Sequence, residues 1–347
     1  MNDEIKNDIC NLVNGISCDN IDTANILESH RCLYLLSKMP SQKMKAMIQL
    51  VANQTVLKQR YLLCANVFDT LSEIPYAVIK GAILSDAIYP NPAYRISGDI
   101  DLLVSASNID KVKEILFDNG FIQGYVEGGR IIPYTRSELI YQKVYTHQIA
   151  AFVKETGNPI CPFINIDVNR DIMWGESGIH TDMNEFLEHT IPYEIYGVEV
   201  RKLEPVHEFI SLCLHHYKDL NSLYLLAKSG IKLSLFCDIY YYITKMSPDI
   251  MELKKICDSF KVTDYITFCL YHTNRILKSD KLDEYLTVFK ADVASYLLNR
   301  IGLTEDEYKY PDFGVSDYIF DWDFTTKYNE LLTEKDRRKI ETNRKYM

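Results

Sequence analysis

Two aspartates separated by one residue, Asp99 and Asp101, stand in the sequence Ser-Gly-Asp-Ile-Asp-Leu-Leu-Val, where an apolar run begins. Side chains alternate along a strand, so both carboxylates would face the same side of a sheet. Two like charges on neighbouring positions of one face repel each other, unless a divalent cation binds an oxygen of each. The pattern therefore predicts a cation site at the start of a strand, with Mg²⁺ as the simplest occupant.

Composition agrees with an ordinary globular protein. The chain has 347 residues, 47% of them apolar, which predicts two or three subdomains with buried cores. Its apolar runs are short and its first residues lack a signal-peptide pattern, so we expect a cytoplasmic protein with no membrane segment. Nine cysteines without a Cys-x-x-Cys motif predict reduced, mostly buried thiols.

Charge argues against non-specific binding to nucleic acid. The formal net charge is −10, whereas phosphate binding needs clustered Lys and Arg. The one dense basic run is Arg337-Arg338-Lys339, and acidic residues such as Glu334 and Asp336 are interleaved with it. We therefore expect a solvated helix face there, not a polyanion site.

Hydrophobic periodicity divides the chain into three zones and predicts an α+β fold. Apolar residues recur at helical spacing before residue 73, which predicts a helical N-terminal subdomain at 1–73. Residues 74–202 mix strand and helix patterns and predict a core with a small mixed β-sheet. Residues 203–347 are helical again, so helical subdomains would flank the core on both sides in the sequence.

Within the predicted core, the patterns assign individual elements. Helices are expected at 83–89 and 108–119, the second ending at Gly120. Strands are expected at 76–79, 100–104, 121–126, 144–153, 163–169 and 193–200.

The segment from Val78 to Val104 resembles a known pattern. Val-Ile-Lys-Gly-Ala-Ile-Leu, Tyr-Pro-Asn-Pro-Ala-Tyr-Arg and Gly-Asp-Ile-Asp-Leu-Leu-Val are similar to motifs of a large family of bacterial nucleotidyltransferases in the DNA polymerase beta superfamily. The aminoglycoside and lincosamide nucleotidyltransferases are more distant relatives. The resemblance implies a glycine turn that opens a helix beneath a triphosphate, an Asp-x-Asp pair that holds two Mg²⁺ ions, and a third carboxylate from a later strand.

Transferred to this sequence, the resemblance gives each residue a role. Gly81 would be the turn glycine, and Asp99 and Asp101 the metal-binding pair. Lys80 and Arg95 would contact the phosphates of the NTP. Without this context, an Asp-x-Asp pair is usually a capping or solvated pair at a strand end, and Lys80 can be an ion-paired strand residue.

The third carboxylate is assigned to Asp167, as metal ligand and candidate base. Alternation in Phe-Ile-Asn-Ile-Asp-Val-Asn puts Asn165, Asp167 and Asn169 on one polar face of a strand. An exposed edge-strand carboxylate is the other interpretation. Two positions depart from the family pattern, since Ala82 replaces the Ser or Gly of the turn and Asn169 stands where a His is expected.

The implied function is Mg²⁺-dependent transfer of a nucleoside monophosphate from an NTP, such as ATP, to a hydroxyl or phosphate acceptor, with release of pyrophosphate. A small-molecule acceptor is the first expectation. Two alternatives stay open: a toxin-like nucleotidyltransferase that modifies RNA or a protein, and a non-catalytic nucleotide-binding protein. His207, His215 and His216 have no usual metal-site spacing, so packing or groove roles are expected for them.

Overall fold

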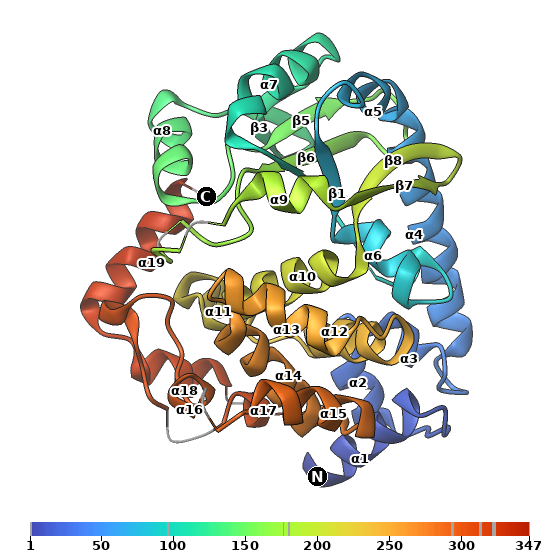
Figure 1. Ribbon diagram of the computed structural model, residues 1–347. Coiled ribbons are helices and arrows are strands. Elements are labelled where there is room, and N and C mark those ends of the chain that lie inside the picture. Colours follow the sequence, from blue (N-terminus) through green and yellow to red (C-terminus); the bar gives the residue numbers. More distant parts are fainter. Residues whose placement is uncertain are drawn as a thin grey trace. The chain divides into compact units, whose positions relative to one another are not determined.

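The computed structural model describes residues 2–95, 97–175, 177–179, 181–292, 295–311, 314–320 and 324–346 (Figure 1). The fold is α+β, as predicted. The chain divides into two compact units, a helical unit of Met1–Leu50 with Leu212–Lys345 and a sheet unit of Val51–Ser211 with Tyr346–Met347. These two units group residues by their contacts in space and do not test boundaries along the sequence. The three subdomains predicted at 1–73, 74–202 and 203–347 therefore stay a prediction.

The helical unit is built around α14 (Thr263–Leu277), which is buried along most of its length. This helix packs against α12 (Leu233–Lys245) and α15 (Asp280–Phe289), and its apolar residues, such as Phe268 and Leu270, are fully enclosed. The helices of this unit are α1 (Asn2–Val13), α2 (Ile21–Ser29), α3 (Leu33–Leu36), α11 (Leu223–Ser229), α12 (Leu233–Lys245), α13 (Ile250–Ser259), α14, α15 (Asp280–Phe289), α16 (Ser295–Leu298), η3 (Glu305–Glu307), α17 (Val315–Tyr318), α18 (Phe324–Leu331) and α19 (Glu334–Tyr346). The boundaries between the units fall inside α4 (Lys43–Leu63), inside α10 (Pro205–Asn221) and before the last residue of α19, Tyr346.

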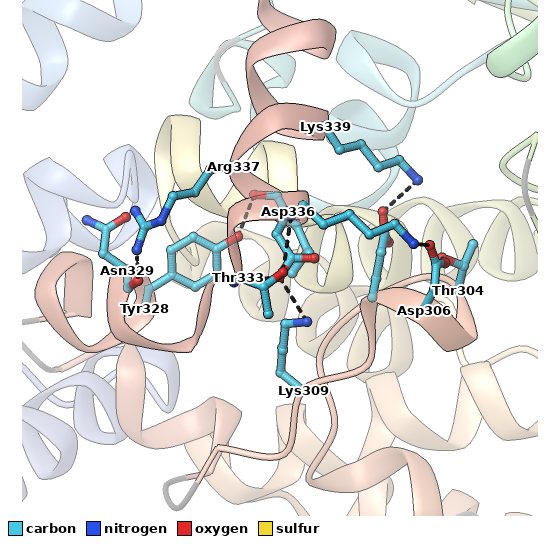
Figure 2. Close-up of polar contacts among 12 residues, drawn as sticks. Thr304, Asp306, Lys309, Tyr328, Asn329, Thr333, Asp336, Arg337 and Lys339 are labelled. Atoms are coloured by element: carbon cyan, nitrogen blue, oxygen red, sulfur yellow. Dashed lines mark hydrogen bonds and ion pairs between the residues drawn. The ribbon is translucent and has the colours of Figure 1, made fainter.

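The C-terminal helix α19 carries the basic run, and its charges are locally compensated (Figure 2). Lys339 Nζ lies 2.7 Å from Glu307 Oε1, Arg337 donates to the carbonyl of Asn329, and Arg338 pairs with Glu334. Arg337 and Arg338 are exposed. The expected solvated face is therefore confirmed for Arg337 and Arg338, whereas Asp336 of the same run is buried.

The start of α19 depends on Asp336, whose side chain is buried. Its carboxylate accepts hydrogen bonds from the backbone N–H and the hydroxyl of Thr333, at 2.8 and 2.6 Å (Figure 2). The backbone N–H of Asp336 donates in return to Thr333 Oγ1, which completes a reciprocal N-terminal cap. Lys309 Nζ lies 2.9 Å from the same carboxylate, so the cap also neutralises a buried charge.

The sheet unit contains a six-stranded mixed sheet and a separate hairpin. The strands are β1 (Tyr76–Ile79), β2 (Ile100–Val104), β3 (Ile122–Glu127), β4 (Arg130–Pro133), β5 (Phe152–Glu155), β6 (Phe163–Asn169), β7 (Thr190–Ile195) and β8 (Val198–Leu203). The helices are α5 (Ala65–Leu71), α6 (Gly81–Ile88), η1 (Pro92–Tyr94), η2 (Ala106–Asn108), α7 (Ile109–Asp118), α8 (Arg136–Tyr145) and α9 (Met183–Glu188), together with parts of α4 and α10.

The order of strands in the sheet is β1-β2-β6-β5-β3-β4. Only the β2–β6 pair is parallel among these neighbours, and the other pairs are antiparallel. The predicted mixed sheet is therefore confirmed. Strands β7 and β8 form a two-stranded hairpin, and β8 lies beside β1. Every residue of β1 and β2 is buried, which explains the short apolar run of β1 and the apolar run of β2 that only Asp101 interrupts.

Two predicted strands were wrong. The segment 144–153 is not one strand, because α8 continues to Tyr145 and β5 begins only at Phe152. The segment 193–200 crosses a turn, where Tyr196 and Gly197 take positive φ angles of 55° and 80° and reverse the chain between β7 and β8. Positive φ at both central residues is typical of a tight two-residue hairpin turn.

All nine cysteines are free thiols and most are buried, as expected. Among the described residues, none of the helices combines the length and the apolar character that crossing a bilayer requires.

Replacing Asp336 should test the buried cap. We expect Asp336→Asn to lower the free energy of unfolding at pH 7 by about 3 kcal/mol, because the buried Lys309 ammonium loses its counter-charge. Burial opposes ionisation, but the hydrogen bonds from Thr333 and the charge of Lys309 outweigh it, so the pKa of Asp336 is lowered. The stabilisation is therefore complete above the unfolded-state pKa of about 4 and disappears as pH falls through the lower folded-state pKa.

Urea unfolding at pH 7 and at about pH 3 measures this difference, which should shrink at the acidic pH. Asp306→Asn is the matched control, because Asp306 pairs with Lys335 at 2.6 Å in an exposed position. Its effect should stay within about 1 kcal/mol. Equal losses in the two variants would show that Asp336 contributes no more than a surface pair.

Candidate active site

The parallel pairing of β2 with β6 brings two of the predicted carboxylates together. Asp101 and Asp167 are direct partners in the register, and such partners point to the same face of a sheet about 4.8 Å apart. On its other side, Asp101 is the register partner of Ile79, the last residue of β1. Asp101 is buried and Asp167 is half-buried. The sheet therefore places one buried and one accessible carboxylate side by side.

Lys80, at the junction between β1 and α6, places its ammonium group against Asp101. Lys80 Nζ lies 3.2 Å from Asp101 Oδ1, and both side chains are about nine-tenths buried, with exposures of 8% and 11%. Lys80 has φ 56° and ψ −146°, a conformation that side-chain-bearing residues rarely adopt. Such a conformation costs about 1–3 kcal/mol and persists where the surroundings enforce it. The Lys80–Asp101 contact is one interaction that holds it.

Gly81 follows with a positive φ of 47° and begins α6. A Cβ at this position would lie 3.2 Å from Ser97 Oγ, so the loop before β2 approaches the turn closely. Ser97 Oγ donates to the carbonyl of Asp99 at 2.9 Å and fixes the loop that carries the first aspartate. The predicted turn glycine is thus required both by its backbone angle and by this close approach.

Asn169, at the end of β6, holds the other side of Asp101. Its Nδ2 donates to Asp101 Oδ1 at 3.3 Å and to the carbonyl of Leu102 at 3.2 Å. Its Oδ1 accepts a hydrogen bond from Gln148 Nε2 at 3.0 Å. Asn169 is 1% exposed, so this buried amide is satisfied on both sides. At the position where a His was expected, the chain has a residue that orients the central carboxylate.

Asp99 lies just before β2, and its surroundings disfavour its charge. Burial raises the pKa of Asp99, and the neighbouring negative charge of Asp101 raises it further. The positive charges of Lys80, Arg60 and Arg95 oppose the rise without cancelling it. The two carboxylates of the Asp-x-Asp pair therefore repel each other, as the sequence predicts.

Arg60, on α4, is a part of the site that sequence reasoning missed. It is 6% exposed, and its Nη1 donates to the carbonyl of Ser97 at 2.9 Å. The guanidinium therefore fixes the loop before Asp99 and also contributes positive charge. Gln148 was missed as well, because it lies in a segment predicted to be a strand. No pattern in the sequence of α4 marked Arg60, because the burial of its side chain is seen only in the fold.

Structural contacts account for Asp171 and for two of the histidines with expected packing or groove roles, His215 and His216. Asp171 Oδ1 accepts from the N–H of Met173 and from Thr181 Oγ1, which makes it a turn residue. His215 Nε2 lies 3.2 Å from Asp219, and the buried His216 lies 3.4 Å from Asp238, all in the helical unit.

The assembled group has the chemistry of a site for a divalent cation and a phosphate. Carboxylate oxygens are the ligands that Mg²⁺ prefers. Asp99 and Asp101, around the start of β2, and Asp167, in the second half of β6, offer three such carboxylates. The Lys80 ammonium, 3.2 Å from Asp101 Oδ1, already places one positive charge against these carboxylates.

Comparisons with known proteins assign the chain to a family. A search of the curated proteins finds no match. Among solved structures, the chain is similar to an antigenic nucleotidyltransferase-like protein from Paracoccidioides brasiliensis, with a TM-score of 0.32 and 16% identity over 60% of this chain and 93% of that chain. The protein family described as uncharacterised nucleotidyltransferase matches residues 23–278. Because this match covers well over half of the sequence, the chain belongs to that nucleotidyltransferase family.

Proposed function

We propose that the protein transfers a nucleoside monophosphate from an NTP to a hydroxyl or phosphate acceptor, with Mg²⁺ bound by Asp99, Asp101 and Asp167. The observation that carries the proposal is the direct register pairing of Asp101 with Asp167 in a member of a nucleotidyltransferase family. Asp99, two residues before Asp101, adds the third carboxylate.

The residues present fit two magnesium ions in charge and in donor type. Three carboxylates lie near one another with Lys80 as the contacting cation, and the pKa of Asp99 is raised by burial and by Asp101. Added divalent charge would offset that repulsion. When bound, the ions would lower the pKa of the attacking hydroxyl and neutralise charge on the departing pyrophosphate.

The chain's own groups account for binding of the triphosphate. Gly81 lacks a Cβ, so phosphate oxygens can approach the backbone N–H groups at the start of α6, where the helix dipole is positive. The Lys80 ammonium would leave the Asp101 carboxylate and bind a phosphate oxygen instead. Arg95, directly after η1, would donate hydrogen bonds to the phosphates. Asp167, more accessible than Asp101, would accept the proton of the acceptor hydroxyl.

A small-molecule acceptor is favoured over RNA. The net charge is −10, and the basic run on α19 is already paired within its own unit. An RNA substrate would need a basic surface that neutralises several phosphates.

Removing the carboxylates should abolish binding of the donor. We expect Asp99→Asn, Asp101→Asn and Asp167→Asn each to weaken Mg²⁺-dependent NTP binding at least tenfold and to remove transfer, because each loses a charged ligand. Isothermal titration with each of the four NTPs, with and without Mg²⁺, measures the binding.

Asp118→Asn is the matched control, since Asp118 is an exposed aspartate at the end of α7 in the same unit. It should bind like the native chain. Native-like NTP binding and transfer in all three site variants would refute the assignment. Binding without transfer to any acceptor in the native chain would instead favour the non-catalytic alternative.

If Lys80 neutralises Asp101 only until a metal ion binds, Mg²⁺ should be able to replace the charge of Lys80. In metal-free buffer, Lys80→Met should lower the free energy of unfolding by about 3–5 kcal/mol, because the buried Asp101 loses its counter-ion. Millimolar Mg²⁺ should restore a larger part of the stability in Lys80→Met than it adds to the native chain. Urea unfolding with EDTA and with Mg²⁺ measures both quantities.

Lys113→Met is the control for loss of a lysine. Lys113 pairs with Asp110 at 3.1 Å on the surface of α7. Its removal should cost less than about 1 kcal/mol and should show no rescue by Mg²⁺. If Mg²⁺ changes the stability of Lys80→Met no more than that of Lys113→Met, the Asp101 carboxylate does not take a metal in exchange for Lys80.

A further inference from the structure

Three potential metal ligands meet at the open end of the β7–β8 hairpin, and none of them takes part in the proposed transfer. His189 immediately precedes β7, and Glu204 immediately follows β8. Thr190 and Leu203 are register partners, and the N–H of Glu204 donates to the carbonyl of His189 at 2.9 Å. The backbone therefore holds these two residues opposite each other.

The third group comes from the helix that follows. The carbonyl of Glu204 accepts from the N–H of Glu208 at 2.8 Å, so Glu204 is the residue that opens α10, with Pro205 as its first residue. His207 lies three positions after Glu204, and this spacing at a helix start brings the two side chains together. The pairing of β7 with β8 and the start of α10 thus bring the side chains of His189, Glu204 and His207 together.

The side-chain geometry is compact. His189 Nδ1 lies 3.2 Å from Glu204 Oε2, and one ligand atom from each of His189, Glu204 and His207 lies within 4.8 Å of the others. The two imidazole rings are stacked, with centroids 4.2 Å apart and planes 11° from parallel. Phe186 packs edge-on against His207 and closes the apolar side.

His207 provides the second, independent observation. It is 2% exposed, and within the part of the chain that the structure describes, neither of its ring nitrogens has a hydrogen-bond partner. Leaving buried polar groups unsatisfied costs about 1–3 kcal/mol, so such groups call for an explanation. Burial, reinforced by the charge of His189, lowers the pKa of His207 to about 4, so the ring is neutral at pH 7 and keeps a lone pair.

We propose that His189, Glu204 and His207 bind a divalent transition-metal ion of the Zn²⁺ class. Two imidazoles and one carboxylate are a donor set that suits Zn²⁺, whereas Mg²⁺ takes oxygen ligands. Bonds of about 2.0–2.2 Å require the three ligand atoms to draw closer and the stacked rings to turn so that their nitrogens converge. His189 can turn, because its side chain is 46% exposed.

Such an ion would tie the end of the hairpin to the start of α10. Because β8 lies beside β1, the ion would brace the strand that leads to Lys80. The proposal does not depend on nucleotidyl transfer, because its ligands and its metal class are different from those of the carboxylate site.

The test measures Zn²⁺ binding to the full chain in the absence of nucleotide. After removal of metals with a chelator, titration with Zn²⁺ in millimolar Mg²⁺ should reveal one site of micromolar or tighter affinity. Mg²⁺ should not compete, because two of the three ligands are imidazoles. His189→Ala and Glu204→Ala should each weaken the site at least tenfold, and Zn²⁺ should raise the melting temperature of the native chain but not of these variants.

Two further variants make the result specific. Asp101→Asn should bind Zn²⁺ like the native chain, which separates this site from the carboxylates, and so should His215→Ala, a histidine on the same helix. Co²⁺ in place of Zn²⁺ should give visible absorption bands that His189→Ala lacks. Equal Zn²⁺ binding in the native chain and in both ligand variants, or no binding by the native chain, would refute the site and leave His207 as a packing residue against Phe186.

Discussion

The buried charge of Asp101 is the constraint on which the rest of the candidate site depends. A carboxylate inside a sheet is stable only with a counter-ion and hydrogen bonds around it. Lys80 supplies the charge from a strained strand–helix junction, and Asn169 supplies an amide N–H. Gln148 in turn satisfies Asn169. One buried group thereby ties together β1, β2, β6 and the segment before β5.

The parts of this arrangement that the sequence predicts are those determined by local pattern. Strands β1, β2 and β6 were predicted at 76–79, 100–104 and 163–169, because burial on both faces, or on alternate positions, leaves a clear apolar signature. Alternation also predicted that Asp167 and Asn169 share a face. That Asp101 and Asp167 are partners could not be predicted, since parallel register depends on long-range packing and not on either strand alone.

The parts that were missed depend on contacts distant in sequence or on turn geometry. Arg60 reaches Ser97 across 37 positions, and no pattern within α4 specifies that target. The hairpin turn at Tyr196-Gly197 interrupts an alternating run with a residue that rarely takes positive φ, so the run read as one strand. Gly197 was the signal that could have divided it. The helix α8 was overlooked although Thr135 and Glu138 form a complete capping box before it.

The number of carboxylates at the site argues for a function beyond stability. Lys80 needs only one counter-charge, and Asp101 provides it with Asn169 as support. Asp99 and Asp167 add negative charge beside this pair. Burial first, and then the charge of Asp101, raises the pKa of Asp99, and the positive charges of Lys80, Arg60 and Arg95 do not cancel the rise. A purely structural ion pair would be more stable without the extra carboxylates. In the proposed function, bound Mg²⁺ would offset the repulsion between these carboxylates, which a purely structural role leaves unexplained.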